Sequence, residues 1–140
     1  MKFTLPEEKL QALGIAGVFL FGSQAQGVAG ELSDFDFGVL LEDVSILKNS
    51  KRKQKQYDAL YDIFSSAVQV LKNIDIVFLQ DVNLQLCFHV IKDGKLLFLG
   101  NQKIVSDFYE RTMEDYADFA PHRWIFENAD RQRSIKEGKF

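Results

Sequence analysis

The sequence predicts an α/β (α+β) domain in which helices flank a small mixed β-sheet. Short apolar runs of strand length alternate with longer stretches that carry apolar residues at helical spacing. Glycine, aspartate and asparagine bound these runs, as is typical of turns. A length of 140 residues suits one domain with one core, and 13 phenylalanines can fill that core.

The first part of the chain is expected to form a helix followed by two strands. Pro6 and the two glutamates after it suit a first helical turn, and Gly14 ends that helix. The continuous apolar run Ile15–Phe21 predicts a strand buried on both faces. Residues 22–30 contain too much glycine and alanine for a strand and indicate a turn leading into a short helix. Asp34–Leu41 is the second predicted strand.

The rest of the chain is expected to add two strands and three helices. The predicted strands are Ile74–Leu79 and, at a sheet edge, Lys95–Gly100; the predicted helices are Lys51–Lys72, Asn83–Lys92 and Asn101–Phe119, the last ended by Pro121. The residues expected to face inward are Tyr57, Leu60, Tyr61, Phe64, Val68 and Leu71 on the first of these helices and Val105, Phe108, Thr112, Tyr116 and Phe119 on the last. We expect residues 1–120 to form the domain and residues 121–140 a charged C-terminal tail. The aromatic Trp124 and Phe126 of this tail either bind a partner or pack back on the domain.

Composition excludes several classes of protein. The net charge of −3 does not favour direct binding of nucleic acid. Cys87 is the single cysteine, which rules out an internal disulfide and fits a reducing compartment. The first residues do not resemble a signal peptide, and no apolar run reaches the roughly 20 residues that span a bilayer. We therefore expect a cytoplasmic protein with no membrane partner.

Two carboxylates interrupt the second predicted strand. Alternate residues of a strand point to the same face, so Asp34 and Asp36 are expected on one face and Phe35 and Phe37 on the other. Two carboxylates that close repel each other unless a positive group lies between them. Oxygen ligands suit Mg²⁺ or Mn²⁺. The pair therefore predicts a divalent cation site.

A glycine and a serine follow the first predicted strand directly. Gly22 lets the backbone approach a ligand closely, and Ser23 can add a hydroxyl donor. The start of the short helix predicted next would present free N–H groups that suit phosphate. Gly22 and Ser23 are thus predicted to hold phosphate beside the cation site.

A third acidic residue is expected to join the site if two metal ions are used. Asp75 is the best candidate, because it lies in an apolar strand where Ile74 and Ile76 alternate away from it. Asp43, Asp62 and Asp81 are weaker candidates in turns or on a polar helix face. Each acid taken alone is explained more simply by capping or solvation, but their joint occurrence with Gly-Ser favours a metal site. His89 has no cysteine or histidine at ligand spacing, which argues against zinc.

These residues resemble a known pattern. Gly22-Ser23, ten residues, then Asp34-Phe35-Asp36 resembles the GSx10DxD signature of the polymerase-β-like nucleotidyltransferase superfamily, and the short chain resembles its minimal members. The downstream stretches "NIDIVFLQDVNLQLCFHVIKDGKLLF" and "FYERTMEDYADFAP" are similar to the antitoxin branch, whose partners are HEPN-domain ribonuclease toxins. The resemblance covers roughly Ile15 to Pro121 and implies the polymerase-β-like nucleotidyltransferase fold.

The resemblance also implies a reaction. Asp34, Asp36 and Asp75 would be the catalytic and metal-binding residues for two Mg²⁺ ions, and Gly22 and Ser23 would hold the phosphates of ATP. A hydroxyl attacks the α-phosphate in line and pyrophosphate leaves. In the antitoxin branch this hydroxyl belongs to a tyrosine of the toxin, and adenylylation blocks RNA cleavage. The implied protein is an adenylyltransferase that acts as the antitoxin of a toxin-antitoxin pair.

One departure and two alternatives accompany this interpretation. Many relatives carry basic residues where this chain has Gln24 and Gln26, which bring no charge to a phosphate. The protein could instead neutralise its partner by steric binding alone, or transfer nucleotide to a small molecule. Such small-molecule enzymes usually carry an extra helical domain, for which this chain has little length. The oligomeric state, including a homo-oligomer, stays open.

Overall fold

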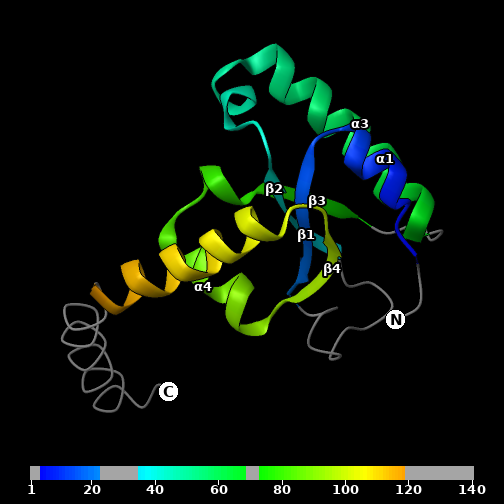
Figure 1. Cartoon of the computed structure of the whole chain (residues 1–140). Helices are drawn as coiled ribbons and strands as arrows, with labels where there is room; N and C mark the ends of the chain where they lie inside the picture. Colours follow the sequence, from blue (N-terminus) through cyan, green and yellow to red (C-terminus); the bar gives the residue numbers. More distant parts are fainter. Residues whose placement is uncertain (1–3, 23–34, 69–72, 119–140) are drawn as a thin grey trace, which may run out of the picture.

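The computed structural model describes residues 4–22, 35–68 and 73–118. The elements in chain order are α1 (Glu7–Ala12), β1 (Ile15–Phe21), β2 (Phe35–Leu41), the 3-10 helix η1 (Val44–Lys48), α3 (Ser50–Val68), β3 (Ile74–Phe78), the 3-10 helix η2 (Leu79–Asp81), α4 (Leu84–Asp93) and β4 (Lys95–Leu99). A further helix spans residues 102–118. The expected α/β class is confirmed, with α1 and α3 on one side of the sheet and α4 and helix 102–118 on the other (Figure 1).

The sheet is mixed, as the sequence predicts. Its strand order is β3-β2-β1-β4, with β1 antiparallel to both of its neighbours and β2 parallel to β3. The parallel pair is possible because α3 crosses over between β2 and β3. The predicted edge position of β4 is confirmed, since among the described strands β4 pairs with β1 alone. This order brings the end of β1 and the starts of β2 and β3 to one edge of the sheet, here the edge formed by strand ends and not by an outer strand.

One face of the sheet packs against α1 and α3. Its core consists of alternate strand residues, among them Val18 and Leu20 of β1, Phe37 of β2 and Ile76 of β3. Phe64 of α3 stacks on Phe37 with ring centroids 4.2 Å apart and planes at 16°. This ring pair fixes α3 on the central strand β2 and so determines which face of β2 is left for other residues.

The opposite face packs against α4 and helix 102–118. Phe19 of β1 lies fully buried there, with the rings of Phe108 and Tyr109 at 6.1 Å and 5.8 Å. Val90 of α4 and Val105 of helix 102–118 complete this second cluster. Among the inward positions predicted for the last helix, Val105 and Thr112 are buried and Phe108 and Tyr116 are half-buried. The two clusters place the sheet in the middle of a three-layer core.

The structure corrects two details of the prediction for α3. Tyr61, which was expected inside, is 39% exposed and stacks on Tyr57 at the outer margin of the helix. Gln56, which was not expected inside, is buried and donates a hydrogen bond of 2.8 Å to the backbone carbonyl of Leu13. The buried residues of α3 therefore recur every four positions, and partly buried residues beside them pack against the same core: Tyr57, Ile63 and Ala67.

Other predicted features lie at or beyond the limits of the described residues. The third strand ends one residue earlier than expected, since Leu79 begins η2. The residues expected inside at Leu71 and Phe119, the short helix expected after Gly22 and the tail over residues 121–140 lie outside the described residues. Within the described ranges, no helix combines the length and apolar character that a bilayer crossing requires.

Candidate functional site

Gly22 directly follows β1 at the edge where the strands meet. Its φ of +78° lies in the left-handed region that favours glycine. A Cβ atom at this position would collide with the Oδ2 atom of Asp36. The Asp36 carboxylate therefore lies directly against the Gly22 backbone, and only glycine leaves room for it.

Asp36 and Asp75 lie side by side on neighbouring parallel strands. They are register partners in the β2–β3 pairing, and Phe21 is the partner of Asp36 on the β1 side. Their neighbours Phe35, Phe37, Ile74 and Ile76 all belong to the core cluster beneath α1 and α3. Because successive strand residues alternate between faces, both carboxylates point to the face of the sheet that α4 covers. Asp36 is half-buried and Asp75 is exposed.

The pKa of Tyr57 in α3 depends in part on the charge of Asp75. Burial raises the pKa of the Tyr57 phenol, and the negative charge of Asp75 raises it further, with smaller effects from Tyr61 and Asp58. The carboxylate of Asp75 on the outer strand β3 is therefore close enough to Tyr57 of α3 for its charge to affect the Tyr57 phenol.

Two of the five predicted site residues cannot be compared with the structure. Ser23 and Asp34 lie outside the described residues. In the part of the chain that is described, no group of three metal-binding side chains comes together. The paired carboxylates of Asp36 and Asp75 fit a hard divalent cation, because oxygen ligands are what Mg²⁺ takes and one or two carboxylates suffice.

The three weaker acidic candidates have local roles. Asp43 caps η1, accepting from the backbone N–H of Ser45 at 3.0 Å and from its hydroxyl at 2.6 Å, and these bonds lower the pKa of Asp43. Asp81 forms an ion pair of 2.7 Å with Lys53. Asp62 lies exposed on α3. None of the three joins Asp36 and Asp75.

A pair of polar residues that the sequence did not link to this site, His89 and Asp93, lies near this edge. His89 of α4 lies edge-on to Phe21, with ring centroids 6.3 Å apart and planes at 87°. Its Nδ1 atom is 3.2 Å from Oδ2 of Asp93, one helical turn later. The spacing of four residues in a predicted helix indicates that His89 and Asp93 can contact each other. The contact of His89 with Phe21 depends on how α4 packs, which no local pattern reveals.

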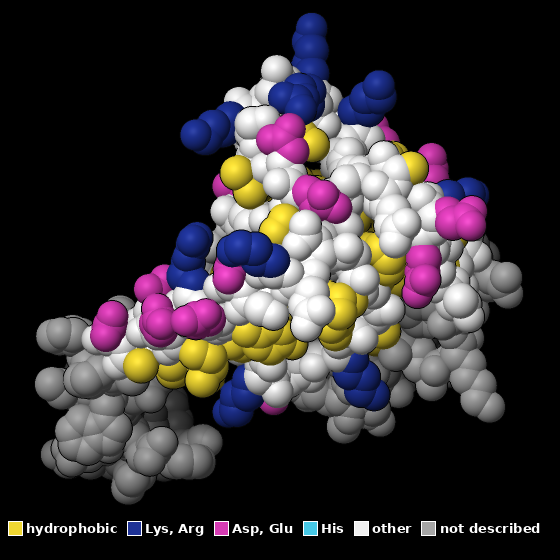
Figure 2. Space-filling model, in the orientation of Figure 1, with side chains coloured by type: hydrophobic (Ala, Val, Ile, Leu, Met, Phe, Trp, Pro, Cys, Tyr) yellow, Lys and Arg dark blue, Asp and Glu magenta, His cyan; other side chains and the backbone are white. Residues whose placement is uncertain are grey.

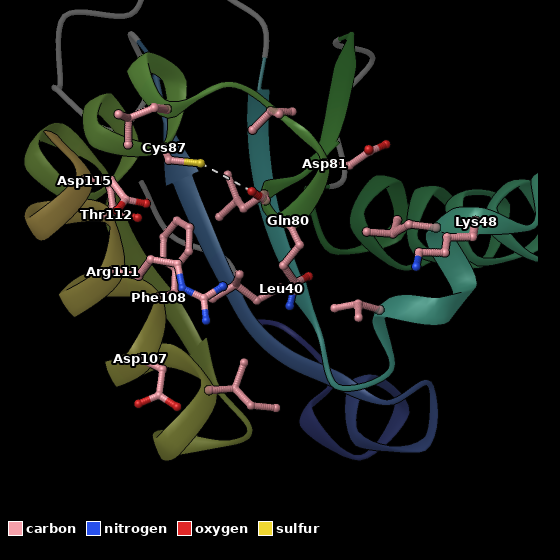
Figure 3. A pocket seen from close by; sticks show the side chains of 16 residues that line it. Leu40, Lys48, Gln80, Asp81, Cys87, Asp107, Phe108, Arg111, Thr112 and Asp115 are labelled. Atoms are coloured by element: carbon pink, nitrogen blue, oxygen red, sulfur yellow. Dashed lines mark hydrogen bonds between the residues drawn. The ribbon is translucent and has the colours of Figure 1, made fainter. Parts of the chain in front are cut away.

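A cavity of about 720 Å³ lies elsewhere, between η2, α4 and helix 102–118 (Figure 3). Leu40, near the end of β2, lines it, whereas Asp36 lies near the start of β2, about 13 Å away along the strand. Cys87 lies beside the cavity and donates from Sγ to the carbonyl of Leu79 at 3.3 Å, and burial raises the pKa of this thiol. The cavity is therefore separate from the predicted carboxylate site.

The surface over β4 and helix 102–118 carries exposed apolar residues. Figure 2 shows an apolar band along helix 102–118, beside a row of acidic side chains. The large hydrophobic residues exposed on these two elements are Leu96, Leu99 and Met113. An apolar band like the one along helix 102–118 is typical of protein interfaces.

The chain is similar to solved toxin-antitoxin structures. It shares 27% identity and a TM-score of 0.58 with a chain of a toxin-antitoxin with AMP-PNP, a match that covers 89% of this chain and 98% of that one. A chain of a mutant MntA-HpeT toxin-antitoxin shows 25% identity and a TM-score of 0.56, over 89% and 98% of the two chains. A chain from the complex of tri-AMPylated Shewanella oneidensis HEPN toxin with MNT antitoxin has the same fold, at 24% identity and a TM-score of 0.52 over 88% and 94%.

The family of the chain follows from a match of most of its length. No curated protein sequence matches this chain. The model of the family described as polymerase beta, nucleotidyltransferase matches residues 7–103, a range that includes Gly22, Asp36 and Asp75. The chain therefore belongs to the polymerase beta nucleotidyltransferase family.

Proposed function

We propose that this protein is a Mg²⁺-dependent adenylyltransferase that acts as an antitoxin. It transfers AMP from ATP to a hydroxyl, that of a tyrosine on a HEPN-domain toxin, and so inactivates the toxin. The observation that carries the proposal is the juxtaposition of Asp36, Asp75 and the Gly22 backbone at one sheet edge, in a chain of the nucleotidyltransferase family.

The proposed roles follow from the chemistry of each group. Asp34, Asp36 and Asp75 hold Mg²⁺, which when bound offsets the charge of the triphosphate and of the leaving pyrophosphate. Gly22 and Ser23 hold the phosphates, because a backbone without a side chain can approach them closely. Asp75, the exposed acid, takes the proton from the attacking hydroxyl oxygen.

Two observations support a protein as the acceptor. The relatives at 25% and 27% identity come from toxin-antitoxin pairs, one of them with the ATP analogue AMP-PNP. The apolar band along helix 102–118 gives this chain a surface suited to a protein partner (Figure 2). A small-molecule acceptor would not require such a surface.

The proposal is tested by incubating the full chain with ATP labelled at the α-phosphate, Mg²⁺ and a HEPN-domain toxin. We expect label on a toxin tyrosine and loss of the toxin's RNA cleavage. Asp36→Asn should reduce transfer by more than about 100-fold, because loss of a direct ligand exceeds the effect known for residues that only support ligands.

Asp81→Asn is the matched control. It also removes one carboxylate, but beyond the other end of β3, where Asp81 pairs with Lys53. Transfer should stay within about twofold of the wild type, the range of an exposed ion pair. If Asp36→Asn neutralises the toxin fully and no label is transferred by either protein, steric binding replaces the proposed reaction.

A further inference from the structure

We propose that His89 binds the triphosphate of the nucleotide, an assignment that rests on the proposed function. Gln24 and Gln26 bring no positive charge to the segment after Gly22, so a triphosphate held there lacks a cation from that segment. His89 lies at the same sheet edge on α4 and can supply a donor to the phosphates.

The packing of α4 places His89 beside the candidate site. The ring of His89 meets the ring of Phe21 edge-on at 6.3 Å, and Phe21 is the register partner of Asp36. Paired residues of an antiparallel ladder share a face, so His89, Phe21 and the Asp36 carboxylate lie on the same side of the sheet. Phe21 is also the last residue of β1, directly before the Gly22 backbone.

The end of α4 is held closely against β1. A Cβ atom on Gly94 would meet the carbonyl of Val90 and would lie 3.1 Å from the carbonyl of Leu20. The turn after α4 therefore lies close against the backbone of β1, where a side chain on Gly94 would be crowded. This contact fixes the last turn of α4, which carries Asp93 and supports His89.

Asp93 orients the imidazole ring. Because Nδ1 of His89 faces the Asp93 carboxylate at 3.2 Å, Nε2 on the other side of the ring is directed away from it. The side chain of His89 is 41% exposed, so the ring reaches the surface of the protein. The ring therefore places one nitrogen at an acidic residue and leaves the other for a phosphate oxygen. Asp93 is thus a positioning residue.

Of the two neighbouring lysines, Lys95 is less well placed for this role. Lys95 pairs with Leu20, whose side chain packs beneath α1 and α3, so Lys95 lies on the opposite face of the sheet. Lys92 is exposed on the last turn of α4. If His89 and Asp93 served only as a helix-end ion pair, their removal would affect stability but not nucleotide affinity.

The test measures the affinity of the full chain for Mg²⁺-AMP-PNP by calorimetry, together with KM and kcat for transfer to the toxin. His89→Gln should weaken the affinity and raise KM for ATP by about 10-fold, the effect of one hydrogen bond to a charged group, with kcat within about twofold. His89→Arg should keep the affinity, because arginine places a cationic donor at the same position. Asp93→Asn should have a smaller effect on KM than His89→Gln.

Lys103→Gln is the matched control, since it removes the cation of another i,i+4 ion pair, that of Lys103 with Asp107 at 2.8 Å. Its affinity for AMP-PNP should equal that of the wild type. A wild-type measurement needs no variant: the ¹⁵N signal of His89 Nε2 should shift when Mg²⁺-AMP-PNP is added and not when adenosine is added.

The outcomes separate this inference from the proposed function. An unchanged KM in His89→Gln, or a ¹⁵N signal that does not move, overturns the role of His89 while transfer by the wild type stands. Affinity that depends on His89 in a protein that transfers no label supports the binding role and contradicts the transferase.

Discussion

Gly22 is held by two constraints at once, its positive φ of +78° and the Asp36 carboxylate against its backbone. In Gly22→Ala the new methyl group must displace that carboxylate. Since a misplacement of about 1 Å can cost 100-fold in rate, we expect transfer to fall by about 100-fold or more. The substitution should also lower the free energy of unfolding by about 1–2 kcal/mol, the cost of a left-handed residue. Single-turnover transfer and urea unfolding measure the two effects.

Gly14 provides the control for backbone strain alone. Its φ of +71° matches that of Gly22, but a Cβ atom there meets nothing within 4 Å. Gly14→Ala should therefore lose similar stability and keep its transfer rate. Equal losses of rate in the two variants would show that strain, and not the contact with Asp36, makes Gly22 necessary.

Tyr57 offers a readout of the charge on Asp75. Burial is the main reason that the pKa of Tyr57 is raised, and the Asp75 carboxylate adds to it because a negative charge disfavours the tyrosinate. Asp75→Asn removes that charge, so the pKa of Tyr57 should fall while staying above its ordinary value. Titration of ¹³C-labelled tyrosine by NMR at high pH measures it, and Asp62→Asn, on the exposed face of α3, should leave the value unchanged.

The candidate residues that could be predicted from sequence are those with a local signature. Gly22 follows a strand of apolar residues, and Asp36 and Asp75 interrupt two others, so alternation alone gives the face of each acid. The register that makes Asp36 and Asp75 partners is a property of the assembled sheet. His89 was missed for the same reason, because its contact with Phe21 joins residues far apart in sequence.

At the scale of elements, the strands were predicted well and the face of α3 less well. β1 has the predicted bounds because a continuous apolar run between two glycines leaves little choice. α3 is amphipathic over a wide arc, so its sequence allowed Tyr61 inside as readily as Gln56. In the structure Gln56 is the buried one, and its amide donates to the part-buried carbonyl of Leu13.

The contact between α3 and β2 should contribute much of the stability of this layer. Phe64 is fully buried and stacks on Phe37 at 4.2 Å, so Phe64→Ala should lower the free energy of unfolding by about 3–5 kcal/mol. Tyr61→Ala, on the same helix but 39% exposed, should cost less than about 1 kcal/mol. Urea denaturation followed by circular dichroism gives both values, and a reversed order would contradict this account of α3.

At the scale of the whole molecule, stability and the proposed chemistry lie in different places. The two apolar clusters hold the helices on the sheet, and neither includes Asp36 or Asp75. Removing divalent metal with EDTA should therefore abolish transfer and leave the thermal unfolding temperature within about 2 °C, a shift that corresponds to about 0.5 kcal/mol or less for a domain of this size. A metal that holds the fold together, as structural zinc does, would instead cause unfolding on chelation.

Because the site lies outside the core, the shift in unfolding temperature on adding nucleotide measures nucleotide binding. Mg²⁺-AMP-PNP at 100 times its dissociation constant should stabilise the folded wild type by about 2.7 kcal/mol, because a ligand that binds only the folded state shifts the unfolding equilibrium. Asp36→Asn should fold like the wild type, since Asp36 lies outside both clusters, but should lose most of that increment because it loses a metal ligand. Thermal unfolding with and without the nucleotide checks both statements. Equal stabilisation of the two proteins would mean that the nucleotide binds away from Asp36, and the cavity beside Cys87 would then be the place to search.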